Sequence, residues 1–257
     1  MHRTNSIPRT SYALENWKLR PAMYCAMRGF ILVVIVWTAS TEQSISEVRS
    51  LSMHDRHVCN AVQLEREFFI TPAACLRARA QGEFELIGSD RFPPKVTSKT
   101  QCYVTRGQSH PKYIFLSHNI ALIQVQCGQS LREVQNTSIS DSKTNDHLTL
   151  AGVNNSLRRV STHVETQKCA LCQKEYAEFS CKRQICLKLS RKVTQKLSTV
   201  EGLVGAGIFT QNAKLVGVLS YGFANGSLVA ERVIYYKQFL HRTMQEFQRG
   251  KNNSPSF

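Results

Sequence analysis

Short apolar runs separated by polar stretches make up most of the sequence after residue 50. The clearest runs are 68–70, 113–115, 120–125, 148–150 and 215–219. Runs of this length suit strands and are too short for helices, and repeated strands with turn signals between them predict an all-β sandwich or barrel. The polar stretches 128–146 and 154–168 are interpreted as long loops.

One helix is predicted near the end of the chain. Its side chains recur at steps of three and four residues, namely Tyr236, Phe239, Leu240, Thr243, Met244 and Phe247. Gly250 is expected to end it, and a polar tail covers 248–257. We expect the apolar stripe to pack on the body of the fold. The basic polar face (Lys237, His241, Arg242 and Arg249) is expected to face solvent.

The N-terminal region has the pattern of an export signal. Arg28 precedes the apolar run 29–37, and the small residues 38–40 follow it, so 27–40 is interpreted as a signal peptide. The run is too short to span a bilayer, which needs about 20 residues. A buried strand is the alternative. Residues 1–26 are interpreted as an upstream extension of unclear status.

The cysteine count agrees with export. Beyond Cys25 there are eight cysteines: Cys59, Cys75, Cys102, Cys127, Cys169, Cys172, Cys181 and Cys186. An even number in an exported chain predicts up to four disulfides. A zinc site is the alternative for the last four, but their spacing is poor for zinc and we expect no metal. The sequence also contains four Asn-x-Ser/Thr triplets, which are candidate N-glycosylation sites and fit an exported surface, at Asn136, Asn154, Asn225 and Asn252.

Basic residues exceed acidic ones. The chain carries 33 Lys and Arg against 18 Asp and Glu, a formal charge of +15; the first 40 residues hold +4 of this, which leaves +11. Such an excess permits polyanion binding, and the alternative is that the basic stretches are solvated surface, as charge runs usually are. The basic stretches contain Arg77, Arg79, Arg91, Lys95 and Lys99 in one and Lys182, Arg183, Lys188, Arg191, Lys192 and Lys196 in the other. Nucleic-acid binding has no motif and conflicts with export.

Three blocks of sequence carry a resemblance to a known family. Residues 59–64 and 69–75 look like CGGSLI and VLTAAHC, 110–113 and 119–123 look like HPxY and DIALL, and 202–209 and 215–222 look like GDSGGPLV and LVGVVSWG. In order and spacing they resemble the trypsin-like serine proteases. Residues 148–152 and 228–247 agree with further segments of that family.

The resemblance implies an architecture for residues 41–247. It implies two antiparallel six-stranded β-barrels and a C-terminal helix. It also implies the disulfides Cys59–Cys75 and Cys172–Cys186. Cys102 and Cys127 fall on neighbouring strands of the family fold, where they could pair, and Cys169 and Cys181 would then remain. The pairing of these four cysteines is left open.

The same resemblance implies that the catalytic residues are absent. Ala74 stands where the family has its histidine, Asn119 replaces the aspartate, and Val204 replaces the nucleophilic serine. Acyl transfer needs a nucleophile, a base beside it and a carboxylate orienting that base. The family's substrate pocket maps to Ser198, Gly202, Ser220, Tyr221 and Gly222. We therefore expect no peptidase activity and no cofactor.

The sequence thus predicts a secreted serine protease homologue of the non-catalytic kind familiar in insects. Such a protein would act as a binding protein, cofactor or decoy in a proteolytic, immune or reproductive pathway. Its expected partners are extracellular proteins, including active serine proteases or their substrates, and the mature chain is expected to have no transmembrane segment. One alternative is a polyanion-binding protein, for glycosaminoglycan or a cell surface. Another is a residual serine endopeptidase with a rearranged site.

Overall fold

The computed structural model describes residues 48–54, 56–77, 84–87, 101–127, 137–189, 201–223 and 226–252. The predicted extension (1–26), the predicted signal peptide (27–40), Asn136, Ser198 and Asn225 lie outside the described residues.

The first half of the described chain forms a closed antiparallel barrel. Its strands are β1 (Val48–Met53), β2 (Arg56–Glu65), β3 (Phe68–Thr71), β4 (Phe84–Ile87), β5 (Gln101–Ser109) and β6 (Ala121–Cys127). They follow the order β1-β2-β3-β6-β5-β4, and β4 pairs back with β1 to close the barrel. The short helix α2 (Ala73–Arg77) follows β3 directly.

The second half repeats this arrangement. Its strands are β7 (His147–Val153), β8 (Arg159–Thr166), β9 (Gln184–Leu189), β10 (Gly207–Phe209), β11 (Leu215–Gly222) and β12 (Leu228–Arg232). Their order is β10-β11-β12-β9-β8-β7, and β7 pairs with β10. Helix α3 (Cys169–Glu175) lies between β8 and β9, and the 3-10 turn η1 (Glu201–Leu203) precedes β10. The predicted pair of six-stranded barrels is confirmed.

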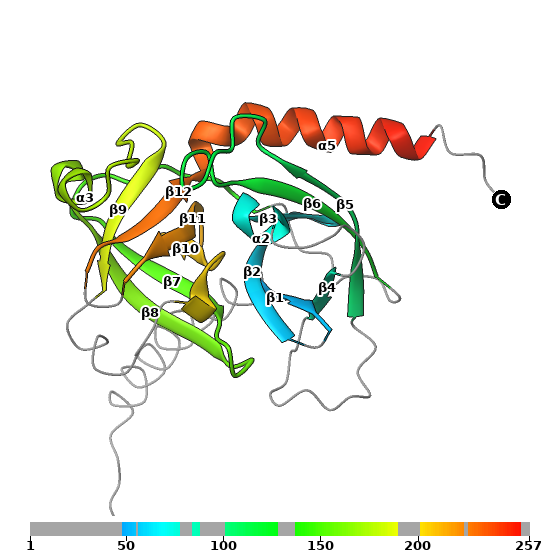
Figure 1. The fold of residues 1–257 in the computed structure, drawn as a ribbon, viewed down its shortest axis with the longest axis horizontal. Helices are drawn as coiled ribbons and strands as arrows, with labels where there is room; N and C mark the ends of the chain where they lie inside the picture. The colour runs from blue at the N-terminus through cyan, green and yellow to red at the C-terminus, as the bar shows by residue number, and fades with distance from the viewer. Residues whose placement is uncertain are drawn as a thin grey trace, which may run out of the picture. The chain divides into compact units, whose positions relative to one another are not determined.

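A shared apolar core joins the barrels. Phe68 and Leu122 of the first barrel belong to the same buried cluster as Phe209 and Val218 of the second. Fully burying a side chain of this size stabilises a fold by about 1.5–3 kcal/mol. The two barrels therefore form one packed body (Figure 1).

Four disulfides join the eight cysteines of the described region. The pairs are Cys59–Cys75, Cys102–Cys127, Cys169–Cys181 and Cys172–Cys186. Each lies within one barrel. Cys59–Cys75 and Cys172–Cys186 are the pairs that the resemblance implied, and the structure supplies the pairing of the other four cysteines. Four bonds of this kind fit an oxidising compartment.

The predicted C-terminal helix is present as α5 (Lys237–Asn252), after the 3-10 turn η2 (Val233–Tyr236). It runs across the first barrel, over β5 and β6 (Figure 1). Leu240 is buried in the shared core, with Phe239, Met244 and Phe247 packed against it. The helix continues two residues beyond Gly250, because one glycine costs a helix only about 1 kcal/mol.

Two sequence interpretations are wrong. The apolar run 113–115 is not a strand: Ile114 pairs with Ser117 across a tight turn, and Ile114 and Phe115 are 74% and 71% exposed. The polar stretch 154–168 is not a long loop, since it contains β8. In β8 the alternate residues Thr162, Val164 and Thr166 are buried, so threonines on the inner face hid the strand pattern.

Candidate functional site

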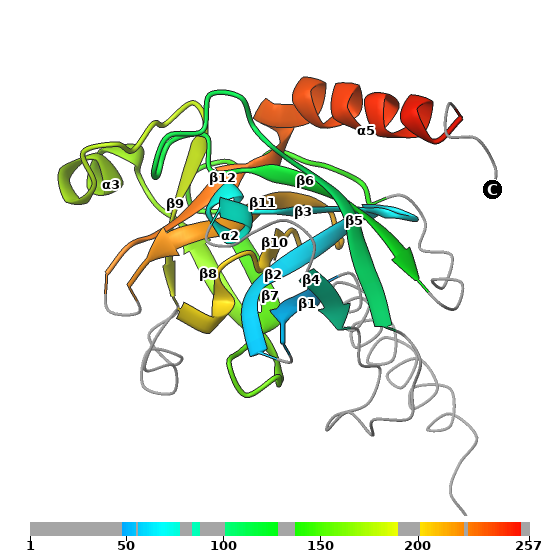
Figure 2. The same cartoon turned by 45° about the vertical axis from the view of Figure 1, so that its right-hand side comes forward.

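Asn119 lies at the junction of the two barrels, immediately before β6. Its side chain is buried, and its Oδ1 accepts a hydrogen bond of 2.8 Å from the main-chain N–H of Ala74 on α2. Its Nδ2 donates a bond of 2.8 Å to Ser220 Oγ on β11. Figure 2 shows α2 beside β11 at this junction. One carboxamide therefore joins three segments that are far apart in the sequence.

Val204 lies in the turn between η1 and β10. Its partly buried side chain packs against the cluster that contains Cys59 and Cys75. The Ala74 side chain is exposed. The structure therefore brings Ala74, Asn119 and Ser220 together by hydrogen bonds and ties Val204 to the same barrel junction by packing.

Asn60 on β2 fixes the Val204 turn and has a role that sequence reasoning missed. Its main-chain N–H donates 2.7 Å to Val204 O. Its Nδ2 shares two hydrogens among Val153 O at 3.1 Å, Gly202 O at 3.0 Å and Val204 O at 3.2 Å. Its Oδ1 accepts from Val153 N at 2.6 Å. The available signal was weak: Asn60 stands in a strand segment that is mostly apolar, Cys59 to Leu64, which also contains Gln63.

Gly205 makes this close approach to Asn60 feasible. Its φ is +85°, a left-handed conformation that L side chains rarely adopt. A Cβ built there would lie 2.0 Å from Asn60 O, so only glycine fits.

His57 supports the same turn from β2. Its Nε2 lies 2.8 Å from Gly202 O and its Nδ1 lies 2.7 Å from Ser50 Oγ. Burial lowers the pKa of His57, while the hydrogen bond to the Gly202 carbonyl opposes this effect. The neutral ring therefore donates from Nε2 and accepts the Ser50 hydroxyl at Nδ1. Both ring nitrogens are occupied by this structural role.

The predicted pocket residues Ser220, Tyr221 and Gly222 lie together at the end of β11. Ser220 is buried, and Tyr221 packs edge to face on Tyr176 with 5.2 Å between ring centroids. Burial, with a contribution from Glu231, raises the pKa of Tyr221 to about 12. Gly202, the remaining described pocket residue, is buried beside the Val204 turn.

A buried carboxyl group lies behind this junction. Glu231 Oε1 is 2.8 Å from Gln184 Nε2, and its Oε2 is 2.7 Å from the Tyr236 hydroxyl. The main-chain N–H of Asn119 also bonds to it. Burial raises the pKa of Glu231, and these three donors oppose the rise. Sequence patterns gave no signal for this group, because a lone Glu in a strand is normally on its solvent face.

The remaining predicted residues lie elsewhere. Asn154 is in the turn between β7 and β8, where its Oδ1 accepts from the N–H groups of Ser156 and Arg158 at 3.0 and 2.9 Å. Asn252 is the last residue of α5. Within the described ranges, no group of three or more His, Cys, Asp or Glu is arranged to hold a metal ion. None of the described helices is both long and apolar enough to cross a membrane.

The side chains at the junction are a methyl group, a carboxamide, an isopropyl group and a hydroxyl. None of these is a proton acceptor of useful strength at neutral pH. The hydroxyl of Ser220 is bonded to the amide of Asn119, and no imidazole is among its described partners.

Comparison with known proteins supports the architecture. The structure is similar to that of kallikrein-related peptidase 10, solved alone and in complex with Zn²⁺, with a TM-score of 0.64 and 17% identity over 79% of this chain and 98% of that one. It is also similar to mouse neuropsin, a serine protease expressed in the limbic system of the brain, with a TM-score of 0.60 and 17% identity over 79% and 96% of the two chains. No curated protein matches the sequence. The trypsin family model matches residues 36–240, about four-fifths of the chain. This chain therefore belongs to the trypsin family.

Proposed function

We propose that this chain is a secreted, non-catalytic serine protease homologue that acts by binding extracellular proteins. The observation that carries the proposal is the hydrogen bonding of Asn119, whose carboxamide occupies the barrel junction between Ala74 and Ser220. In this account Ala74, Asn119 and Val204 occupy the triad positions of the family.

The side chains at positions 74, 119 and 204 support this proposal over a surviving peptidase. A methyl group at position 74 cannot take a proton, and an isopropyl group at position 204 cannot attack a carbonyl carbon. Asn119 donates to Ser220 and so would not draw a proton from that hydroxyl. His57 is the described imidazole bonded nearest to the Val204 turn, and it is bonded through both nitrogens to Ser50 and Gly202.

Loss of the reacting groups leaves a surface that can still hold a peptide. Ser220, Tyr221 and Gly222 end β11 at the junction, where an extended peptide could add as a further strand. Partners of this kind include active serine proteases and their substrates, in a proteolytic, immune or reproductive pathway. The insect-type assignment rests on the sequence resemblance.

The test is incubation of the purified protein with a mixed-sequence peptide library, followed by mass spectrometry of bound and free peptides. We expect bound peptides to be recovered intact. The matched control is the triple variant Ala74→His, Asn119→Asp, Val204→Ser, made to ask whether the scaffold can act when the groups are restored. Cleavage of library peptides by the unmodified protein at a rate matching that variant would overturn the proposal.

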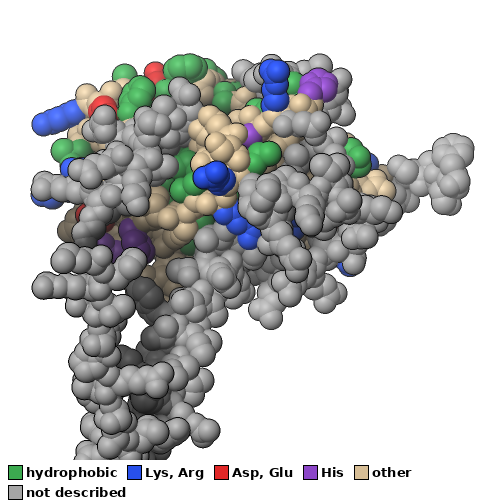
Figure 3. Space-filling view, turned by 90° about the horizontal axis from the view of Figure 1, so that it is seen from below, with side chains coloured by type: hydrophobic (Ala, Val, Ile, Leu, Met, Phe, Trp, Pro, Cys, Tyr) green, Lys and Arg blue, Asp and Glu red, His purple; other side chains and the backbone are tan. Residues whose placement is uncertain are grey.

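Polyanion binding is a second candidate function. The distribution of basic residues favours it only in part, because most of the basic stretch from Arg77 to Lys99 lies outside the described residues. In the view from below, described Lys and Arg side chains stand in several separate places (Figure 3). The specific observation in its favour is a basic pocket beside α5.

A further inference from the structure

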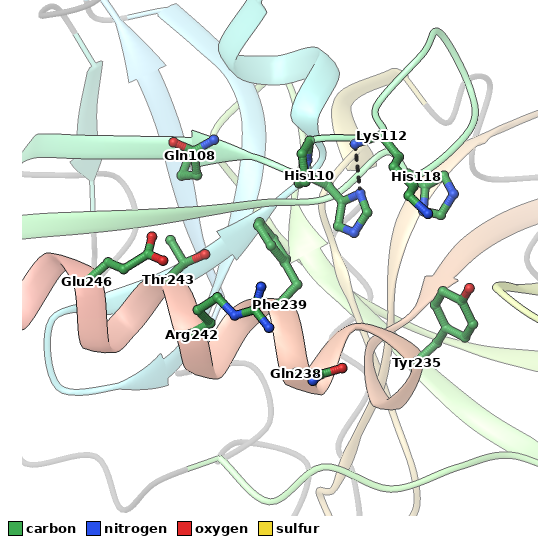
Figure 4. Close-up of a pocket in the computed structure, with 11 residues that line it drawn as sticks. Gln108, His110, Lys112, His118, Tyr235, Gln238, Phe239, Arg242, Thr243 and Glu246 are labelled. Atoms are coloured by element: carbon green, nitrogen blue, oxygen red, sulfur yellow. Dashed lines mark hydrogen bonds between the residues drawn. The ribbon is translucent and has the colours of Figure 1, made fainter.

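A pocket of about 590 Å³ lies between α5 and the 110–118 segment that connects β5 to β6. Figure 4 shows α5 passing along one side and His110, Lys112 and His118 on the other. Its volume falls in the ~300–1,000 Å³ range of ligand pockets. It is separate from the junction of Ala74, Asn119 and Ser220, since none of these residues lines it.

The charge of this pocket is predominantly positive. Lys112 and Arg242 line it from opposite sides. Arg183 reaches the same connecting segment, where its Nη2 donates 3.2 Å to Ser117 Oγ. In the described part of the chain no carboxylate lies within 4.0 Å of these three cationic groups to form an ion pair. Glu246 lines the pocket, but Figure 4 shows its carboxylate apart from the Arg242 guanidinium.

Burial and the nearby positive charges lower the pKa of both pocket histidines, His110 and His118. Their rings stack at 4.7 Å with an angle of 3° between planes. Burial, then Arg183, His110 and Lys112, lower the pKa of His118 to about 4. Nδ1 of His118 is buried and has no hydrogen-bond partner among the residues that the structure describes. The pocket therefore contains unpaired cations and a neutral ring nitrogen still able to bond.

The rest of the lining combines polar uncharged side chains with Pro111, Tyr235 and Phe239. Gln108, Gln238 and Thr243 bring amide and hydroxyl groups, which suit the hydroxyls of a sugar. Both aromatic rings already have partners: Phe239 makes an edge-to-face contact with His110, and Lys182 Nζ lies 5.9 Å from the centroid of the Tyr235 ring. A site for nucleic-acid bases would need free aromatic faces for stacking.

We propose that this pocket binds a sulfated saccharide. Lys112 and Arg242 hold the sulfate group, and the amides of Gln108 and Gln238 meet the sugar hydroxyls. The inference deepens the polyanion function proposed above by giving it a location and a ligand class, and it holds whether or not the barrel junction is catalytic.

The experiment measures binding of a heparin-derived hexasaccharide to the purified full chain by calorimetry at 0.15 M salt. We expect the double variant Lys112→Ala, Arg242→Ala to bind at least about tenfold more weakly, because it loses two charge-assisted hydrogen bonds. Glu246→Gln should bind about two- to fivefold more tightly, because it removes the one described carboxylate of the pocket.

The matched control is Lys174→Ala, Lys214→Ala, which removes the same charge from two exposed positions that lie outside the pocket lining, in the second half of the described chain. We expect it to change the affinity less than twofold. If both double variants weaken binding equally, the polyanion function stands and the pocket proposal is wrong. If the unmodified chain does not bind the hexasaccharide, both are wrong.

Two further ligands test whether the sulfate groups and the saccharide are both needed for binding. The desulfated hexasaccharide should bind at least about tenfold more weakly than the sulfated one, since the cations lose their partner. Inorganic polyphosphate of similar charge should bind more weakly as well. Equal binding of polyphosphate, with equal sensitivity to the Lys112 and Arg242 variant, would show a general anion site and overturn the saccharide assignment.

Discussion

Asn60 donates to the carbonyl oxygen of Val204 from both its main chain and its side chain, at 2.7 and 3.2 Å. This pair connects β2 of the first barrel to the turn before β10 of the second. It also fixes the main chain at the position where the family resemblance puts the nucleophile. The turn is therefore held in place by contacts that do not depend on the Val204 side chain.

The first prediction concerns the stability of this connection. Replacing Asn60 by Ala removes the acceptor of the Val153 N–H and one donor from each of the carbonyls of Val153, Gly202 and Val204, so we expect the free energy of unfolding to fall by about 2–4 kcal/mol. Urea unfolding measures the change. Asn212→Ala, at an exposed turn, is the control and should shift it by less than about 0.5 kcal/mol. Equal effects of the two substitutions would contradict the role of Asn60.

The second prediction concerns pH and His57. Burial lowers its pKa in the folded chain below the ordinary 6.5, so the unfolded chain binds a proton first as the pH falls. The free energy of unfolding should therefore decrease from pH 6.5 downward, until the pH reaches the folded-state pKa. His57→Gln should make this decrease less steep, as measured by urea unfolding at several pH values between 7 and 5. His163→Gln, on the exposed face of β8, is the control. An unchanged slope in His57→Gln would rule out this contribution.

The third prediction concerns Glu231, whose contribution to stability falls as the pH rises, opposite to that of His57. Burial raises the pKa of Glu231 above its ordinary 4.5, so the folded chain keeps a proton that the unfolded chain releases. This contribution to stability is lost as the pH rises above 4.5. Glu231→Gln does not titrate, and its stability relative to the unmodified chain should increase from pH 5 to pH 8. Glu178→Gln, at an exposed position, is the control. A stability difference that does not vary with pH would show that Glu231 is ionised throughout.

The barrels and two of the disulfides, Cys59–Cys75 and Cys172–Cys186, were predictable because their signals are local or follow from the family order. Apolar runs such as 120–125 and 215–219 indicate strands by themselves, and the predicted helix has a clear three- and four-residue period. The 113–115 run was misassigned because an apolar sequence does not reveal whether a turn exposes it. β8 was missed because threonine can face a core when its hydroxyl finds a partner, as Thr166 does with Lys143 O.

The site was only partly predictable for a different reason. Its residues are brought together by tertiary contacts between distant segments, as in the bond from Asn119 to Ser220, 101 residues away. The resemblance gave the positions 74, 119 and 204 but not the roles of Asn60 and Glu231. The pocket beside α5 was not predicted: the basic face of the helix was expected to face solvent, and the other wall of the pocket comes from the distant 110–118 segment.

The most direct test of the proposed loss of catalysis is covalent labelling of the purified mature protein by a serine-directed phosphonate, followed by intact-mass measurement. An active serine hydrolase takes up one phosphonate group on its nucleophile. We expect no mass increase, because Val204 has no reacting group and Ser220 is bonded to a carboxamide. A stoichiometric mass increase that Ser220→Ala abolishes would contradict the account and identify a rearranged catalytic serine.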